Sequence, residues 1–370
     1  MLYFPLAYLK PDMVLAQDIP APNGLFSLLM KGQVLTAALI AKLYSFEIDG
    51  VYVESDMGED IEPESLLETN ERRRIMTDLR AAYISIASQP HITPAVAEST
   101  KTLAANIVDK LLDREDVLMD IMEIKSYDNY TYSHSMNVCI LSVLIGRQYG
   151  LSLNRLTDIA LCGLLHDVGK VDIPIEIINK RGPLTNEEFE IVKAHPSLGV
   201  ERLRKCYNIS REVLEGIQCH HEKYDGTGYP YKYKGDRLPL FAKILSVADV
   251  YDALTSQRSY RGAWMPCDAI EYIMAQADIQ FDRDIIDCFL HIVCAYPTGT
   301  IVRLSEGSLA VVVKNHPENV LRPLVRLMDD CSLGKKKDDL DLLEDPRYLN
   351  VTVTAMLGSA ADQSSEQAIM

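Results

Sequence analysis

Histidines and aspartates gather near the middle of the chain, in apolar settings where isolated polar residues are costly. Five of the eight histidines lie between positions 134 and 221. His166 and Asp167 follow the apolar run Leu161–Leu165, and Asp249 ends a second apolar run. A buried, unpaired carboxylate costs several kcal/mol, so these groups must be neutral, ion-paired or bound to a metal. Neutral imidazoles suit first-row transition metals and a carboxylate can bridge two cations, so the set predicts a metal site.

A lysine strengthens this interpretation. Lys170 follows Asp167 by three residues, which places both on one face of a helix. An ammonium beside a metal-bound phosphate would stabilise the charge that develops in phosphoryl transfer. A lone histidine or aspartate in a helix is more often structural than a ligand, and we interpret His91, His291 and His316 as surface or packing residues for that reason. The central group differs because its members occur together.

The elements that must position these side chains are helices. From about 72 to 295 apolar residues recur at near-helical spacing, as in Leu103, Ile107 and Leu111, and strand alternation is almost absent. Residues 1 to about 55 differ, with short apolar runs that predict a hairpin of 25–29 with 34–35, a helix from Thr36 and a strand at 51–53. After Gly299, β-branched runs predict a β-rich extension. The predicted fold class is mainly α, with a small N-terminal α/β module and a β-rich C-terminal extension.

Composition excludes some functions. With 37 basic and 53 acidic residues the net charge is −16, which disfavours binding of long nucleic acid. A small anionic ligand stays compatible with this charge, because a few cations can reverse the electrostatic field in one pocket.

No apolar stretch reaches the roughly 18 residues of a membrane span, and the start lacks a secretory pattern, so we expect a cytoplasmic protein. Eight single cysteines without a Cys-x-x-Cys pair predict reduced core residues.

At these residues the sequence resembles the HD-GYP family, a branch of the HD-domain metal-dependent phosphohydrolases. The resemblance covers about 126–295, roughly half the chain. Its motifs are His166-Asp167 with Gly169-Lys170, His195-Pro196, the string from His220 to Pro230 that contains Gly228-Tyr229-Pro230, and the segment from Ala248 to Arg261. The residue patterns and the resemblance together predict these domains: 1–55 an α/β module, 56–125 an acidic linker with connecting helices, 126–295 an all-helical HD-GYP catalytic domain, which the resemblance implies, 296–357 the β-rich extension and 358–370 a flexible tail.

The resemblance also implies roles for individual residues. One metal would be held by His134, His166, Asp167 and Asp249, and a second by His195, His220 and His221 with Asp167 as the bridge. Catalytic roles would fall to Asp167, Lys170 and Asp252, and substrate contacts to Lys170, Gly228, Tyr229, Pro230, Arg258 and Arg261. Some relatives hold a third metal with a Glu one helical turn before the first His; this chain has Tyr130 there, a poor ligand for a divalent cation. We therefore expect two divalent ions, iron or manganese, and no third.

The implied function is hydrolysis of cyclic di-GMP to pGpG by a metal-bridging hydroxide, and a second hydrolysis to GMP stays open. Two alternatives stay open: a hydrolase of another phosphoester, such as 3′,3′-cyclic GMP-AMP or a nucleoside phosphate, and a non-catalytic sensor or adaptor that binds a cyclic dinucleotide. A homodimer through the helix at 99–124 and a signalling partner on residues 1–55 also stay open, because packing within the chain explains the same apolar residues.

Overall fold

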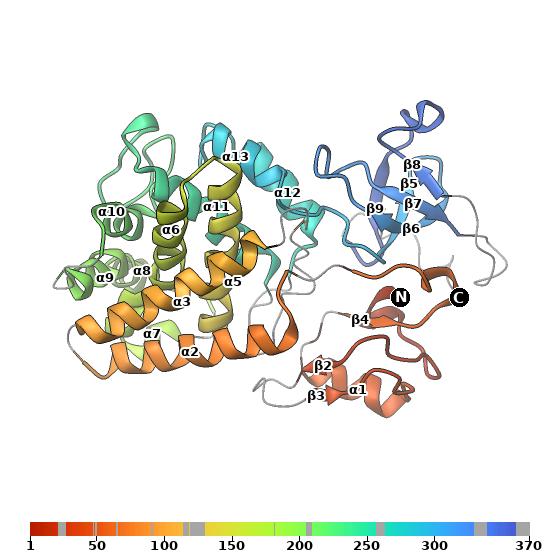
Figure 1. The fold of residues 1–370 in the computed structure, drawn as a ribbon, viewed down its shortest axis with the longest axis horizontal. Helices are drawn as coiled ribbons and strands as arrows, with labels where there is room; N and C mark the ends of the chain where they lie inside the picture. Colours follow the sequence, from red (N-terminus) through yellow and green to blue (C-terminus); the bar gives the residue numbers. More distant parts are fainter. Residues whose placement is uncertain are drawn as a thin grey trace.

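Figure 1 shows the chain as a helical domain beside a smaller part that holds both the first and the last described residues. The coordinates are a computed structural model. The structure describes residues 1–20, 27–46, 48, 50–63, 66–89, 92–113, 118, 130–180, 182–204, 209–256, 263–328 and 339–359.

The N-terminal segment combines two small antiparallel sheets with one helix. β1 (Leu2–Pro5) pairs with β4 (Gly50–Val53), and β2 (Ile19–Pro20) pairs with β3 (Ser27–Leu29). The hydroxyl of Thr36 accepts the Leu39 N–H at 3.2 Å and caps α1 (Ala37–Ser45), as expected of a threonine at that position. The hairpin predicted for 25–29 with 34–35 is wrong, because β3 pairs with β2 while Val34 bridges Val14.

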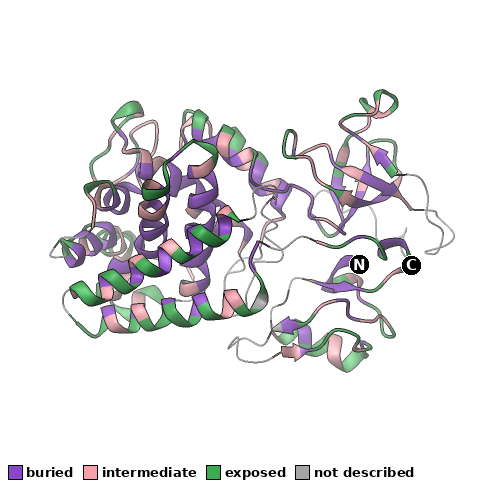
Figure 2. Ribbon diagram, in the orientation of Figure 1, coloured by how far each residue is buried: buried purple, intermediate pink, exposed green. Residues whose placement is uncertain are grey.

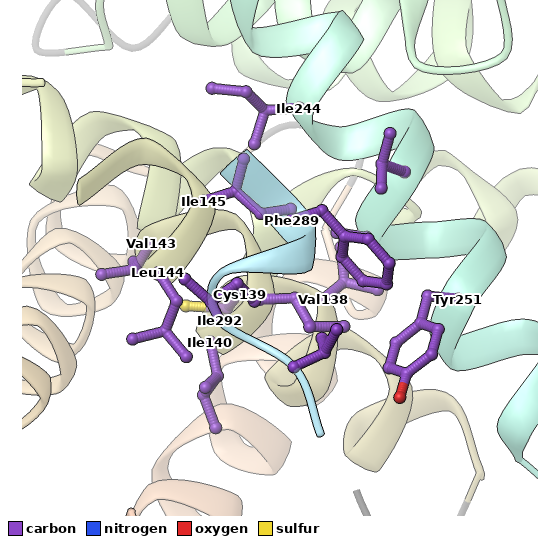
Figure 3. Close-up of a cluster of buried hydrophobic side chains, with 14 of the residues drawn as sticks. Val138, Cys139, Ile140, Val143, Leu144, Ile145, Ile244, Tyr251, Phe289 and Ile292 are labelled. Atoms are coloured by element: carbon purple, nitrogen blue, oxygen red, sulfur yellow. The ribbon is translucent and has the colours of Figure 1, made fainter. Parts of the chain in front are cut away.

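The helical domain is built around α5 (Tyr130–Gln148). Residues 133–146 of this helix are all buried, since other helices pack on every side of it. In Figure 3, Val138 of α5 lies near Phe289 of α13 (Arg283–Leu290) and Tyr251 of α11 (Leu240–Thr255), whereas Ile140 and Leu144 of α5 lie farther from Tyr251. The other helices are α2 (Thr69–Ala87), α3 (Pro94–Leu112), α6 (Leu153–Leu165), α7 (Ile175–Ile178), α8 (Asn186–Val192), α9 (His195–Leu203), α10 (Arg211–Cys219), α11 (Leu240–Thr255), α12 (Pro266–Ala275) and α13 (Arg283–Leu290), with a short 3-10 helix η3 (Val168–Asp172) after α6.

The helices α2 and α3 cover one side of this domain. Each is amphipathic: Leu79 and Ile86 of α2 and Ile107 and Leu111 of α3 are buried. Figure 2 shows their outer faces as exposed and their inner faces as buried. Both helices therefore contribute to the core of the helical domain, although they precede the segment that carries the predicted metal ligands.

The C-terminal segment is a five-stranded antiparallel sheet, which confirms the β-rich extension. The strand order is β8-β7-β6-β5-β9. The strands are β5 (Ile301–Leu304), β6 (Leu309–Lys314), β7 (Leu324–Leu327), β8 (Asp339–Asp341) and β9 (Val353–Met356). The mainly α fold class with its two flanking parts is confirmed.

The two ends of the chain pack on each other, and we call residues 1–61 and 299–359 together the flanking platform. The Tyr3 N–H donates to the Gly299 carbonyl at 2.9 Å, and Leu2 and Ile301 belong to the same buried apolar cluster. Arg326, whose side chain is almost fully buried, binds both oxygens of Asp60 at 2.8 and 3.1 Å.

The domain boundaries stay predictions. Within the described residues, no helix combines the length and apolarity that crossing a bilayer requires.

Candidate metal centre

The predicted ligands come from the ends and middles of five helices that meet in one place. α5 carries His134, and the turn after α6 carries His166 and Asp167. The other ligand positions lie at the start of α9, just after α10 and within α11. The structure gathers all seven positions into one cluster: His134, His166, Asp167, His195, His220, His221 and Asp249.

Six of these residues form two groups of three. In each group the candidate ligand atoms lie within 4.8 Å of one another. All six residues are buried except His221, which is half-buried. The first group is His134, His166 and Asp167, and the second is His195, His220 and His221.

Asp167 lies between the two groups. Its Oδ2 is 3.5 Å from His166 Nε2 and 3.8 Å from His134 Nε2, while its Oδ1 is 3.3 Å from His195 Nε2. Burial acts to raise the pKa of this carboxyl, but the charge of Lys170 and the neighbouring histidines outweigh burial and hold the pKa well below its usual value. Asp167 therefore offers one ionised oxygen to each group, as a bridging ligand must.

Asp249 spans the groups in the same way. Its Oδ1 is 3.2 Å from His134 Nε2, and its Oδ2 is 4.0 Å from His221 Nδ1. Burial opposes its charge, yet the hydrogen bond and the charge of His134 lower its pKa. The sequence predicted that Asp249 binds only the metal of the first group, so its proximity to His221 of the second group had not been expected.

Three histidines have their tautomer set by a backbone carbonyl at or near the end of a helix. The Nδ1 atoms of His166, His195 and His220 lie 2.8, 2.7 and 2.7 Å from the carbonyl oxygen three residues earlier. A carbonyl can only accept, so each Nδ1 carries the proton and donates it. Each Nε2 is then a bare lone pair directed at the centre, which is the form that ligates a metal.

His134 is oriented by a carboxylate instead. Its Nδ1 donates to Asp252 Oδ2 at 2.7 Å, and Asp252 Oδ1 accepts from Asn137 Nδ2 at 2.7 Å. Burial disfavours the imidazolium, but the hydrogen bonds to Asp249 and Asp252 outweigh it and raise the pKa of His134 to about 10. Asp252 itself is fully buried, and both its oxygens are used by protein donors. It therefore contacts the centre through His134.

The donor set fits divalent cations. His166 Nε2 and Asp167 Oδ1 are buried and accept no hydrogen bond from any described residue. The Nε2 lone pairs of His195 and His220 face each other at 3.3 Å, which is repulsive unless a proton or a cation lies between them. Burial lowers the pKa of His220 well below its usual value and that of His221 to about 3, so neither ring takes up a proton near neutral pH. Cations bound by these imidazoles and carboxylates would remove each of these costs.

An open pocket of about 390 Å³ lies over the second group. His220, His221 and Asp249 line one side of it, and Lys193 and Tyr229 are among the residues that line the rest. The Tyr229 ring lies 4.9 Å from the His221 ring at an interplanar angle of 31°, and Lys193 Nζ is 5.7 Å from the centre of the Tyr229 ring. A planar apolar surface and a cation thus adjoin the metal ligands, an arrangement that suits an anion attached to an aromatic base.

Lys170 contacts the carboxylate of Asp167. Its Nζ donates to Asp167 Oδ2 at 2.5 Å, and about a third of its side chain is exposed. The ammonium therefore faces solvent at the edge of the site, where it can also meet an anion.

Two motif glycines allow close approach of backbones. A Cβ on Gly169 would lie 2.0 Å from the His195 carbonyl oxygen, and one on Gly228 would lie 2.4 Å from Glu222 Cα. No side chain can occupy these positions without displacement of the neighbouring backbone. Gly169 thereby lets the Asp167 turn pack directly on the His195 helix.

Some predicted site residues cannot be placed, and other residues had not been predicted. Arg258, Arg261 and the side chain of Tyr130 lie outside the described residues. Asn137 and Glu222 were missed: Asn137 binds Asp252, and Glu222 Oε1 accepts the Tyr231 N–H at 2.6 Å, which anchors the loop after Pro230. Their proximity in sequence to His134 and His221 was the only available signal.

Comparison with known proteins agrees with this site. Residues 116–285 match the HD domain family, and residues 301–354 match a KOW domain associated with HD domains. Over 252 residues the chain is 38% identical to the cyclic di-GMP phosphodiesterase PA4108 of Pseudomonas aeruginosa, a match that covers 67% of this chain and 60% of that protein. It is 35% identical to the cyclic di-GMP phosphodiesterase response regulator RpfG of Xanthomonas campestris, over 52% of this chain and 54% of that protein.

The fold has a solved counterpart in Bd1817, a HDG"Y"P protein from Bdellovibrio bacteriovorus. The TM-score is 0.51 at 16% identity, over 78% of this chain and 97% of that one. These findings confirm the resemblance: the chain belongs to the HD-GYP family of HD-domain proteins. The matched region spans only about 60% of PA4108 and 54% of RpfG, so their activities apply to this chain only as a proposal.

Proposed function

We propose that this protein is a metal-dependent phosphodiesterase that hydrolyses cyclic di-GMP to pGpG. The observation that carries the proposal is the pair of histidine-rich groups with the buried carboxylate of Asp167 between them. Two divalent ions bound there, iron or manganese, would lower the pKa of a water molecule and stabilise the attacking and leaving oxygens of an in-line displacement. Tyr130 supports a count of two rather than three.

The residues of the chain have distinct parts in this proposal. Asp167 holds the two groups at a fixed separation, and Lys170 donates a hydrogen bond to the scissile phosphate and offsets its growing charge. Asp252 is a positioning residue, because its contact with the centre runs through the Nδ1–H of His134. Arg258 and Arg261 would meet a phosphate or guanine of the substrate. The assignment of single residues to each metal follows the expected set, with Asp249 adjoining both groups.

The pocket supports a dinucleotide as the substrate. Tyr229, with Gly228 and Pro230 on either side of it, offers a ring on which a base can stack, and Lys193 lies near enough to that ring to meet a phosphate attached to the base. The names of PA4108 and RpfG favour cyclic di-GMP. Further hydrolysis to GMP, a cytoplasmic location, a homodimer and a protein partner on residues 1–55 stay predictions.

A second substrate has specific support. The chain is 36% identical over 161 residues to the 3'3'-cGAMP-specific phosphodiesterase 2 of Vibrio cholerae, across 43% of this chain and 31% of that protein. This favours 3′,3′-cyclic GMP-AMP as the alternative, since the two substrates differ in one base. A sensor without turnover is the remaining alternative, and intact ligand positions speak against it.

The test is product analysis after anaerobic incubation with cyclic di-GMP and, separately, with 3′,3′-cyclic GMP-AMP, each with Mn²⁺ or Fe²⁺. Wild type is compared with Asp167→Ala, which removes the bridge, and with Asp236→Ala, which removes an exposed carboxylate of the same domain. We expect pGpG from wild type and Asp236→Ala, and no linear product from Asp167→Ala. Bound but unhydrolysed dinucleotide in wild type would support the sensor, and wild-type turnover by Asp167→Ala would refute the bridging role.

A further inference from the structure

A tyrosine from outside the matched HD domain reaches the metal centre. Tyr83 lies on α2, before the region 116–285, and is only 4% exposed. Its hydroxyl donates to the Leu164 carbonyl at 2.8 Å and lies 3.0 Å from Ser135 Oγ. A phenol has one proton, and because Leu164 takes it, the Ser135 hydroxyl must donate to the tyrosine oxygen.

These two contacts join the segments that carry the first ligand group. Ser135 directly follows His134 on α5, and Leu164 precedes His166 by two residues at the end of α6. The last four carbonyls of a helix have no partner within it, so the carbonyl of Leu164 needs a donor from elsewhere. Tyr83 supplies that donor and at the same time contacts α5. One hydroxyl thus fixes the distance between the helix of His134 and the turn of His166.

The geometry around Tyr83 is constrained further. Its ring meets the Tyr132 ring edge-on, with centroids 5.5 Å apart and an interplanar angle of 72°. Burial raises the pKa of the Tyr83 hydroxyl, and the charge of Asp167 raises it further, against the hydrogen bond from Ser135. A raised pKa favours the protonated hydroxyl, which is the form that donates to Leu164.

The end of the same helix, with the residues just after it, also contacts α9, the helix that begins with His195. Arg202, seven residues after His195 on α9, donates to the carbonyls of Ile86 and Gln89 at 2.9 and 2.6 Å. It also binds both oxygens of Asp172 at 2.6 Å, in the short helix that contains Lys170. The C-terminal end of α2 and the residues just after it are therefore in contact with α5, α6, η3 and α9. Of these, α5 carries His134, α6 leads into His166 and Asp167, η3 contains Lys170 and α9 begins with His195.

We propose that Tyr83 is a positioning residue of the metal centre, whose hydroxyl sets the spacing of His134 and His166 and thereby the affinity for metal. Through it the segment before the HD domain forms part of the site. This inference rests on the proposed metal-dependent function. It goes beyond that function by assigning part of the metal affinity to a helix that carries none of the ligands.

The test measures metal binding rather than activity. Full-length wild type, Tyr83→Phe and Tyr52→Phe are titrated anaerobically with Mn²⁺, and free Mn²⁺ is followed by electron paramagnetic resonance. Tyr52→Phe is the matched control, because its buried ring also donates a hydroxyl to a carbonyl, that of Thr298 at 3.1 Å in the flanking platform. We expect Tyr83→Phe to bind Mn²⁺ about tenfold more weakly, as for other residues that orient metal ligands, and Tyr52→Phe to bind as wild type does.

The outcomes separate this inference from the proposed function. Equal Mn²⁺ affinity in wild type and Tyr83→Phe, or equal weakening in both tyrosine variants, would overturn the role of Tyr83 while leaving a metal site in place. Failure of wild type to bind Mn²⁺ or Fe²⁺ would overturn the proposed function and this inference with it. If Tyr83→Phe does not fold, Ser135→Ala tests the same hydrogen bond from α5, with weaker Mn²⁺ binding expected; unchanged binding would refute the proposal.

Discussion

Substitution of Gly169 by alanine should separate the two halves of the metal centre. The new Cβ would lie 2.0 Å from the His195 carbonyl oxygen and 2.5 Å from the Gly199 nitrogen, both of them backbone atoms that cannot rotate away. Real Cβ contacts of this kind begin near 3.0 Å, so η3 and α9 must move apart by about 1 Å. The 3.3 Å between Asp167 Oδ1 and His195 Nε2 would then exceed about 4 Å, longer than the distance between adjacent ligands of one cation whose bonds are about 2.1 Å long.

The expected magnitudes follow from this displacement. Overpacking of a close contact costs about 1–3 kcal/mol of folding stability. Loss of ligand geometry weakens metal binding about 10- to 100-fold, and a misplacement of about 1 Å can reduce turnover about 100-fold. Metal content after gel filtration, thermal unfolding with excess chelator, and hydrolysis of cyclic di-GMP measure the three effects separately.

Gly50→Ala provides the matched control. Its Cβ would lie 2.5 Å from the Phe4 carbonyl oxygen, so it introduces a similar backbone clash in β4 of the flanking platform. Both variants should lose stability, but only Gly169→Ala should lose metal. Wild-type metal content and turnover in Gly169→Ala would refute the inference that contact between η3 and α9 sets the spacing of the ligands.

Three further predictions concern the pocket, the platform and the metal. Lys193→Ala should raise KM for cyclic di-GMP about tenfold with little change in kcat, because a charge-assisted contact is lost; an equal rise for the exposed Lys234→Ala would contradict this. Arg326→Leu should lower the free energy of unfolding by about 2–3 kcal/mol in urea titrations, because it leaves the half-exposed Asp60 and Asp339 without their buried partner. Unchanged stability would refute the ion pair as a link between the chain ends. Chelation with EDTA should lower Tm by several degrees, because a metal present at about 100 times its Kd adds about 2.7 kcal/mol to the free energy of unfolding. A constant Tm would argue against a bound metal.

The sequence predicted the parts of the site that depend on local signals. The side chains of His166 and Asp167 interrupt an apolar helix, and the cost of burying them unpaired is enough to indicate a metal. Helical spacing predicted the helical middle of the chain, and β-branched runs predicted the C-terminal sheet. Thr36 predicted the start of α1 because capping is a contact between neighbouring residues.

Contacts between distant parts of the chain left no such signal. The second contact of Asp249, across to His221, depends on how α10 and α11 pack. The chain does turn at Gly32, but the segments on either side of the turn pair with other parts of the chain, β3 with β2 and Val34 with Val14. Tyr83 looks like an ordinary core aromatic in the sequence. It meets Leu164 only because α2 packs over the end of α6.

The sequence by itself therefore determined which residue types form the metal centre and that helices present them. The tertiary structure alone decided which oxygen of Asp167 faces which histidine, and that the first and last segments form one platform held by Arg326 and Asp60, 266 residues apart. The reason is physical: burial and helical periodicity are written into neighbouring residues, whereas the partner of a hydrogen bond between distant segments is chosen by the packing of the whole chain.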